Sequence, residues 1–455
     1  MIPLMSLSEC WSQSRDLLRV HLQKDLAILF CLALSVRVVV LVLSLVQLGT
    51  DGLFSTSQDT VYYVKAARAL ALGAGDYESA VFSHGPGYPC FLMVSFVVFG
   101  VAALPALVIQ LILASLSCAL LYLLAIELLG DRAVGLTAGL LSAVSVTGVF
   151  LSCSLLSDSL HYFVFLTGLL LFVRGLRRGS WACFVLCGLL TAGAILIHPV
   201  GLFWPVVTAL IAFLWIRRRW YVRHNRLILK VMVCIAIMLV TAAGWVIRNW
   251  CVHGCATIAF SSAGGPATVA AMTLGRMQNR PHREILREWL DDYLRKNGRN
   301  HLSAGENYWR QYGKFKEVLA EHPWRLVETY FRQDWTNIND ISYQHRLLIP
   351  RYDYITRPLE GFVKRYKLNY LTFLLSVIGL VMLCRRSESR AALVLGCVLV
   401  YYSLLIGFFP WQGSRYFYPG HISADILLSV VIVCSARLLL SAFGRWRPRA
   451  GGAPS

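Results

Sequence analysis

Eleven long apolar runs constrain this chain more than any other feature of its sequence. Several are as long as the roughly 20 residues that a helix needs to cross the hydrocarbon core of a bilayer. Backbone polar groups in lipid must be bonded within the segment itself, so such runs fold as helices. We therefore predict an all-α polytopic membrane protein with about 10–11 transmembrane helices. The runs lie at about residues 25–48, 88–104, 105–129, 133–151, 155–173, 181–197, 200–216, 227–247, 367–384, 391–409 and 421–441.

The composition agrees with a membrane protein, because 57% of the 455 residues are hydrophobic and only 15% are charged. The net charge of +19 does not indicate nucleic acid binding. Its basic residues cluster beside the apolar runs, where they set orientation and meet anionic headgroups. The 13 cysteines are scattered, and their spacing predicts neither a metal site nor a disulfide framework. Cys251 and Cys255 are close enough in sequence to be either paired or reduced.

Short basic links predict how the chain is oriented. They are Arg174–Arg178, Arg217–Arg219, Arg385–Arg386 and the C-terminal tail, and the positive-inside rule places all four in the cytoplasm. The first apolar run is interpreted as an anchor rather than a removed signal peptide, so the N-terminus is cytoplasmic too. The resulting division is a transmembrane module at 1–247 with a first external loop at 49–87, an external and partly helical segment at 248–366, helices at 367–441, and a basic cytoplasmic tail at 442–455.

The number of crossings depends on the run at 88–104. Three apolar runs lie between the first external loop and the break at 151–157, and both of these are predicted to be external. An even number of crossings must therefore connect them. The run at 88–104 is the shortest of the three, so we predict that it is re-entrant or only partly inserted.

The first external loop combines an amphipathic stretch with a turn. Asp59, Tyr63, Ala66 and Leu70 recur at helical spacing and share one face. The stretch His84–Pro89 holds two glycines and two prolines, which predict a turn before the next apolar run. Asp59 has two interpretations. It is either the N-cap of the amphipathic helix or a carboxylate that does chemistry at the membrane surface.

Charged residues in or beside the spans need an explanation, because a charge inside a span costs about 2.5–3.5 kcal/mol on insertion scales. Arg37 lies in the middle of the first run, where we expect it to pair with a buried partner. Asp158, Arg248 and Arg415 all lie at the external ends of runs. Each has an ordinary interpretation, as a helix cap or as a side chain reaching toward headgroups. Together with Asp59 on one face, they suit proton transfer by a carboxylate and phosphate binding by arginine.

The long external segment is predicted to be partly helical. His282–Lys296 places apolar residues on one face, and Asn297-Gly298 follows as a stop. A second helix is predicted from Asn307 to Leu319, with a break near His322-Pro323. Catalytic motifs of soluble enzymes, such as phosphate-binding glycine loops, are not found in the sequence.

With these residues identified, the chain resembles the membrane glycosyltransferases of the C superfamily. It is most similar to the bacterial branch related to protein O-mannosyltransferases and lipid A aminoarabinose transferases (glycosyltransferase family 39-like). Each motif is short, but their order and topology match that family. The similar stretches are Asp59–Leu70, Gly85–Pro89, Leu156–Asp158, His198–Gly201, Gly244–Asn249 and Arg415–Pro419.

The resemblance implies transfer of a sugar from a polyprenyl-phosphate donor on the external side of a bacterial inner membrane, by inverting displacement. The acceptor is a lipid, a glycan or a protein. The resemblance implies that Asp59 is the catalytic base, and Asp158, which falls on the family's acidic position after an apolar run, is assigned as a second catalytic residue. Other residues are assigned by position: Arg248, Arg415 and His84 to the donor phosphate, and Tyr63, Asn249 and Tyr416 to substrate binding.

One departure from the family pattern concerns the first loop. Many members carry a second acidic residue near the aspartate, whereas Tyr62 and Tyr63 follow Asp59 here. Asp158, or Asp76 and Glu78, are candidates to replace it. We therefore predict no obligatory cofactor and leave a divalent metal possible but not required. Two alternatives remain, which are a transporter or flippase of a lipid-linked glycan and a catalytically inactive scaffold of the same fold.

Overall fold

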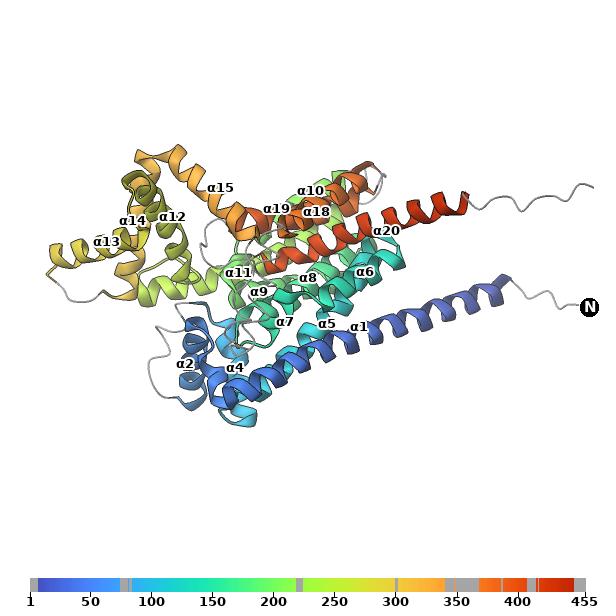
Figure 1. The fold of residues 1–455 in the computed structure, drawn as a ribbon, viewed down its shortest axis with the longest axis horizontal. Coiled ribbons are helices and arrows are strands. Elements are labelled where there is room, and N and C mark those ends of the chain that lie inside the picture. Colours follow the sequence, from blue (N-terminus) through green and yellow to red (C-terminus); the bar gives the residue numbers. More distant parts are fainter. Residues whose placement is uncertain are drawn as a thin grey trace, which may run out of the picture.

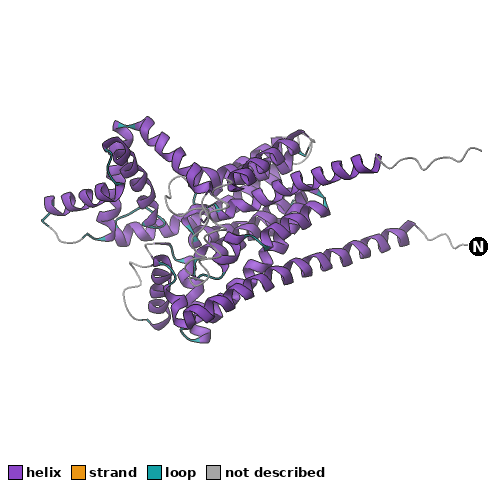
Figure 2. Ribbon diagram, in the orientation of Figure 1, coloured by secondary structure: helices purple, strands orange, loops and turns teal. Residues whose placement is uncertain are grey.

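The computed structural model describes residues 7–73, 81, 84–217, 224–298, 302–339, 348, 368–385, 388–406, 415 and 417–445. These ranges form helices and short connections, without a β-strand (Figure 2). The predicted all-α fold is confirmed. Every apolar run found in the sequence corresponds to a helix or a bent helix pair. They are α1 (Leu7–Gly52), α4 (Gly87–Phe99), α5 (Ala103–Leu129), α6 (Arg132–Ala143) with α7 (Val146–Ser152), α8 (Ser157–Arg178), α9 (Trp181–Ile197), α10 (Trp204–Arg217), α11 (His224–His253), α18 (Leu368–Arg385), α19 (Ser389–Ile406) and α20 (His421–Arg445).

Length separates these helices into two groups. Within the described ranges, six are long and apolar enough to cross a membrane, or seven if α6 and α7, bent by 54° at their break, count as one span. Helices α4, α9, α18 and α19 are apolar but shorter. Six long helices, the bent pair and four shorter ones together account for the eleven runs.

The bundle has two distinct ends. Along the long axis of the molecule, the start of α1 and the end of α20 lie at one end, here called the terminal end (Figure 1). Helix α2 (Gln58–Leu72), α4 and the helices α12–α15 lie at the opposite end, here called the loop end (Figure 1). The segments predicted to be external are thus gathered at the loop end.

Helix α4 covers most of the 88–104 run, and it is short. At about 1.5 Å per residue, its 13 residues extend only about 20 Å, less than the roughly 30 Å of a hydrocarbon core. It packs against α2 at the loop end (Figure 1). Helix α5 then runs to the terminal end, where Arg132 at the start of α6 pairs with Asp25 of α1 at 2.7 Å. The structure therefore connects the loop end with itself through α5 and the α6–α7 pair.

Ion pairs join the helices at the terminal end. Asp131 pairs with Arg437 of α20 at 2.7 Å, next to the pair of Asp25 and Arg132. The carboxylate of Glu127 at the end of α5 lies 3.6–3.7 Å from three arginines at the end of α8, which are Arg174, Arg177 and Arg178. These contacts fasten α1, α5, α6, α8 and α20 to one another at that end.

The buried Arg37 has a structural role, as expected. It is fully buried, and its Nη1 donates to the carbonyl oxygens of Ala33 at 3.0 Å and Ala143 at 3.2 Å. Its Nη2 lies 3.8 Å from the sulfur of Cys118. The partners are thus carbonyls and a thiol, which connect α1 with α5 and the end of α6.

The helices of the segment predicted to be external, here called the external helices, form a unit with its own small core. They are α12 (Ser261–Gln278), α13 (His282–Lys296), α14 (Ala304–Glu321) and α15 (Pro323–Asn339). Buried Val269 and Ala270 of α12 pack against Val318 of α14 and Leu326 of α15. The predicted helix at His282–Lys296 is confirmed, and Asn297 is its C-cap. The helix predicted from Asn307 to Leu319 is longer than expected, because Ser303 and Glu306 form a capping box at its start.

Candidate active site

Four ionisable side chains meet at the loop end, and all four were singled out in the sequence. Arg415 lies between two carboxylates. Its Nη1 donates to Asp59 Oδ2 at 2.6 Å, and its Nε lies 3.0 Å and 2.9 Å from the two oxygens of Asp158. The other oxygen of Asp59 lies 3.4 Å from Nε2 of His84. Residues from α2, α8, the turn before α4 and the segment before α20 thus form one charged cluster.

Asp59 does not cap its helix. Helix α2 is capped by Ser57, whose hydroxyl oxygen accepts a hydrogen bond from the backbone N–H of Thr60 at 3.1 Å. Gly73 ends the helix in a left-handed conformation. Asp59 therefore lies in the first turn with its carboxylate available to Arg415 and His84. The cap interpretation is excluded, and the helical face predicted from Asp59, Tyr63 and Ala66 is the one turned toward the bundle.

Asp158 is not a cap either. Helix α8 begins at Ser157, and its N-cap position, Leu156, makes no side-chain cap hydrogen bond. The side chain of Asp158 is 4% exposed and that of Arg415 is 1% exposed, whereas that of Asp59 is 21% exposed. Asp59 is therefore the carboxylate of this cluster that a substrate can reach, and Asp158 is a buried counter-charge of Arg415.

A tight turn places His84 beside Asp59. Gly85 has φ +96°, and a Cβ there would lie 2.9 Å from the carbonyl oxygen of Leu196 in α9. A Cβ on Gly87 would lie 2.7–2.8 Å from backbone atoms of Ile197. Only glycine permits this close approach of the turn to α9. The turn is shorter than predicted, because α4 already begins at Gly87 and Pro89 is accommodated in its first turn.

The cluster is strongly polarised. Burial alone would raise the pKa of Asp59, but the charge of Arg415 and the hydrogen bond and charge of His84 lower it well below its usual range. Asp59 is therefore ionised across the physiological range. His198, in the turn after α9, has its pKa lowered to about 3 by burial and by the charge of Arg415. It is neutral, and its Nδ1 accepts the backbone N–H of Val200 at 3.2 Å.

Tyr63 connects the first loop to the bundle. Its side chain is buried, and its hydroxyl group lies 3.0 Å from the hydroxyl of Ser157, at the start of α8. Its ring packs edge-on against His84 and Tyr88, with centroids 5.2 Å and 4.8 Å away. Burial raises the pKa of its hydroxyl group. These contacts position α2 against α8, and the predicted substrate contact of Tyr63 stays a prediction.

A second set of hydrogen bonds fixes α4, and sequence reasoning missed it. The hydroxyl of Tyr88 donates to Gln110 Oε1 at 2.9 Å, and Gln110 Nε2 donates to the carbonyl oxygen of Ser154 at 2.7 Å. Both side chains are fully buried. A glutamine in the middle of an apolar run was the available signal, because an amide in such a position needs hydrogen-bond partners.

Arg248 and Asn249 lie at the end of α11. Arg248 donates to Asn249 Oδ1 at 2.9 Å, and its guanidinium stacks over Trp245 at 4.8 Å. Asn249 is fully buried and donates to the carbonyl oxygen of Thr257 at 2.7 Å, so it holds the following loop. Trp245 packs against the small cluster of Ala66 in α2 and Val81, which brings this end of α11 beside the first loop. The predicted residues Tyr416, Asp76 and Glu78 lie outside the described residues.

In the described part of the chain, no three His, Cys, Asp or Glu side chains are grouped closely enough to hold a metal ion. The guanidinium group of Arg415 lies between the two carboxylates of the cluster and pairs with both. Cys251 is exposed and Cys255 is buried, and they are not bonded to each other.

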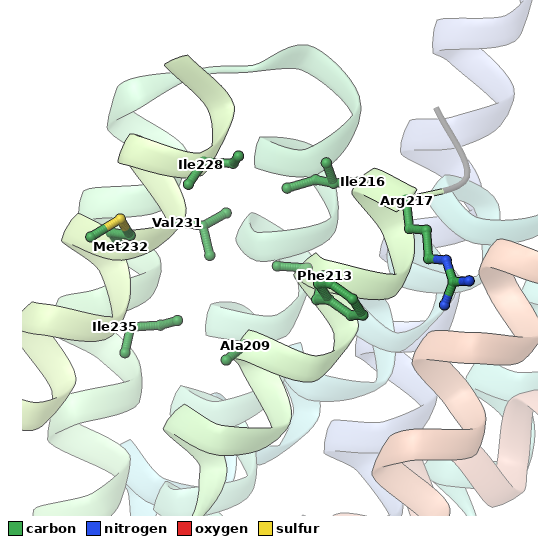
Figure 3. Close-up of a pocket in the computed structure, with 9 residues that line it drawn as sticks. Ala209, Phe213, Ile216, Arg217, Ile228, Val231, Met232 and Ile235 are labelled. Carbon is green, nitrogen blue, oxygen red and sulfur yellow. The ribbon is translucent and has the colours of Figure 1, made fainter. Parts of the chain in front are cut away.

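An apolar groove lies between α10 and α11 (Figure 3). It has a volume of about 620 Å³ and is lined by aliphatic and aromatic side chains, with Arg217 at one edge. Because Arg217 ends α10 and Ile228 is near the start of α11, the groove belongs to the half of the bundle nearer the terminal end. The opposite ends of the same two helices are at the loop end, next to His198 and Trp245.

Comparison with known families gives one match. Residues 83–245 match the family model described as dolichyl-phosphate-mannose-protein mannosyltransferase. The matched stretch includes His84, Asp158 and His198, whereas Asp59 and Arg415 lie outside it. Over these residues the match confirms the resemblance predicted from the motifs. A search among curated proteins gives no match.

Comparison with solved structures gives matches among membrane enzymes. An oligosaccharyltransferase from Archaeoglobus fulgidus, solved with a tethered acceptor peptide, has a TM-score of 0.50 at 13% identity, covering 93% of this chain and 52% of that one. ArnT from Cupriavidus metallidurans, solved bound to undecaprenyl phosphate, has a TM-score of 0.37 at 16% identity, covering 93% and 81%. This chain spans about half the length of the archaeal enzyme, 52%. The archaeal likeness confirms the predicted glycosyltransferase C-type fold.

Proposed function

We propose that this protein transfers a sugar from a polyprenyl-phosphate donor to an acceptor at the loop end, which faces the exterior of a bacterial inner membrane. The observation that carries the proposal is the cluster in which Arg415 joins partly exposed Asp59 to buried Asp158. The family match over residues 83–245 supports it, because two of the four cluster residues lie in that stretch.

The reaction is a single displacement with inversion. A hydroxyl or amine of the acceptor attacks the anomeric carbon of the donor sugar, and the bond from that carbon to the phosphate oxygen breaks. The bonding electrons leave with the polyprenyl phosphate, and the acceptor's proton passes to Asp59. The low pKa of Asp59 keeps it ionised before the reaction. Its partial exposure lets it reach the acceptor, which Asp158 cannot do.

The departing phosphate needs more positive charge than Arg415 supplies alone. Two carboxyl groups already face Arg415. The other basic side chains near this site are His84, whose Nε2 lies 3.4 Å from Asp59, and Arg248, next to Trp245 beside the first loop. Fixed cations in a site shielded from water stabilise developing charge more than mobile ions in bulk solvent do. The phosphate is therefore bound by Arg415, His84 and Arg248 together.

The lipid tail of the donor lies along α10 and α11. Their loop ends adjoin the proposed phosphate site, and their other halves border the apolar groove of Figure 3. An isoprenoid chain is long, flexible and apolar, which suits the side chains of Phe213, Met232 and Ile235 in that groove.

The test is sugar transfer by purified protein in nanodiscs with a panel of polyprenyl-phosphate sugars. The variants are Asp59→Asn and, as a matched control, Asp131→Asn at the terminal end. We expect wild type and the control to release free polyprenyl phosphate, and Asp59→Asn to release it at least about 100-fold more slowly. Equal release by Asp59→Asn would show that another group is the base. No release by wild type with any donor would overturn the transferase proposal.

A further inference from the structure

A basic pocket lies on the external helices, away from the charged cluster described above. It has a volume of about 430 Å³ and is formed between the end of α12 and the first half of α15. Three arginines and one glutamate provide its charged lining, next to two threonines and a methionine. The lining residues are Thr273, Arg276, Met277, Arg325, Glu328, Thr329 and Arg332.

The single carboxylate of this pocket is already occupied. Glu328 Oε2 accepts a hydrogen bond from Arg325 at 3.2 Å, and its Oε1 lies 2.6 Å from Nη2 of Arg332. Both oxygens therefore face guanidinium groups from the neighbouring turns of α15. Counting the charged lining side chains, three positive and one negative, leaves a net charge of +2.

Arg276 faces this arrangement from the opposite wall. Among the described residues it has neither a hydrogen bond nor an ion pair. Burial and the like charge of Arg332 lower its pKa, and the charge of Glu328, already bonded to Arg325 and Arg332, opposes this only in part. The last turn of α12 holds Arg276 in place, and beneath the pocket Val269 and Leu326 pack together in the core of the external helices. The excess charge is thus carried by a rigid helix pair rather than by a loop.

We infer that this pocket binds a phosphate-bearing group of the acceptor, with Arg276, Arg325 and Arg332 as its cationic ligands. Guanidinium groups match tetrahedral oxyanions through paired N–H donors. A phosphate would supply the partner that Arg276 lacks and would offset the repulsion from Arg332. The volume exceeds that of one phosphate, so it also accommodates the sugar or headgroup that bears it.

The inference rests on the proposed function only in assigning the ligand to the acceptor. Binding itself is independent of sugar transfer, so the two proposals fail separately. Loss of phosphate binding with intact release of polyprenyl phosphate would remove the inference and leave the transferase. Phosphate binding without sugar transfer from any donor would leave the inference and overturn the transferase proposal.

The experiment measures binding of inorganic pyrophosphate to the purified full-length protein at constant ionic strength, by calorimetry. The variants are Arg276→Gln, Arg276→Lys and, as a control, Arg287→Gln, which removes an exposed arginine on α13 that does not line the pocket. We expect about tenfold weaker binding for Arg276→Gln, an intermediate loss for Arg276→Lys and no change for the control. Equal affinity of Arg276→Gln and wild type would overturn the inference, as would no binding to wild type or an equal loss in the control.

A second arm identifies the source of the phosphate. The same titrations are made in nanodiscs of phosphatidylcholine and in nanodiscs that also contain phosphatidylglycerol. If bilayer headgroups occupy the pocket, the apparent affinity for pyrophosphate falls in the anionic nanodiscs for wild type but not for Arg276→Gln. If the ligand is a phosphate presented from solution, wild type binds pyrophosphate equally in both. Each result is consistent with an oxyanion site, and each assigns it a different occupant.

Discussion

Asp59 and Asp158 share one guanidinium but differ in their access to solvent. Asp158 and Arg415 are almost completely buried, whereas Asp59 retains one-fifth of its exposure. A buried ion pair is costly to break, because removal of one partner leaves the other charge without compensation. We therefore expect the two carboxylates to have separable effects, with Asp158 acting on stability and geometry and Asp59 acting on the proposed reaction.

Substitution of Asp158 tests this difference. We expect Asp158→Asn to lower the free energy of unfolding by about 3 kcal/mol, because Arg415 loses its buried partner. Asp131→Asn removes one partner of a half-exposed pair and should cost less than about 1 kcal/mol. Denaturant titration of both variants in detergent checks the comparison. Equal losses in the free energy of unfolding would show that the buried pair of Asp158 and Arg415 contributes no more to stability than the half-exposed pair does.

The pH dependence of the transfer rate tests the pairing of Asp59. Its folded pKa is depressed, so the carboxylate stays ionised until the pH falls well below 3.8, and the stability from its ion pair is lost only there. Arg415→Gln removes the largest lowering influence and leaves burial opposed by His84 alone, so the pKa of Asp59 should rise. We expect wild type and Arg415→Lys to have flat rates from pH 5 to 8 and Arg415→Gln to lose rate as the pH falls. A flat profile for all three would contradict the role of Asp59 as base.

The sequence identified the members of this cluster but not how they pair. The apolar runs on either side placed Asp59, Asp158 and Arg415 at one membrane face. Which carboxylate is buried depends on how α2 and α8 pack, and spacing within one helix does not contain that information. The side chain of Asn249 points into its own loop for the same reason, since its partners lie eight or nine residues further along the chain.

At the scale of elements, the turn from His84 to α4 is the part most sensitive to small changes. Its two glycines allow backbone contact with α9, and this contact fixes where His84 lies relative to Asp59. The Gly-Pro pattern predicted a turn here. The identity of the helix it contacts came only from the structure. Helices α12 and α15 were not predicted at all, because Gly264-Gly265-Pro266 is typical of a loop and the helix after Pro323 follows a break.

Two glycine-to-alanine substitutions, one in the turn before α4 and one in α9, test the contact between these two elements. A Cβ on Gly87 would clash with backbone atoms of Ile197, so Gly87→Ala should destabilise the protein by about 1–3 kcal/mol. Gly193 lies inside α9, and a Cβ added there would meet no atom within 4 Å, so Gly193→Ala should be neutral or stabilising by up to about 1 kcal/mol. Thermal unfolding and transfer rates check both. A neutral Gly87→Ala would mean that α4 can move away from α9 at little cost.

At the scale of the whole molecule, the positions of the loop end and the terminal end predict which segments share a side of the membrane. Val61 of α2 and Val101, between α4 and α5, are both exposed at or near the loop end, and Leu440 is exposed near the end of α20. If α4 does not cross the membrane, the first two lie on one side and the third on the other. The sequence predicted an even number of crossings between the first loop and the break at 151–157. The basic links predict the side on which each loop lies, and the shortness of the run at 88–104 indicates which of the three runs does not cross.

Cysteine labelling in intact cells tests the topology. In a background without the exposed cysteines, Val61→Cys and Val101→Cys should react with a membrane-impermeant maleimide from outside. Leu440→Cys should react only after the cells are permeabilised. Reaction of Val101→Cys from the cytoplasmic side alone would show that α4 crosses. Reaction of Val61→Cys from the cytoplasm would overturn the external placement of the whole charged cluster.

The ion pairs at the terminal end lie at the opposite end of the bundle from the charged cluster. Helix α8 reaches both, because Arg174, Arg177 and Arg178 near its end pair with Glu127 and Asp158 lies in its first turn. The 22 residues of α8 extend about 33 Å, so a tilt of about 5° about its arginine end would displace Asp158 by about 3 Å. Salt bridges far from the charged cluster are therefore expected to influence how closely Asp158 holds Arg415.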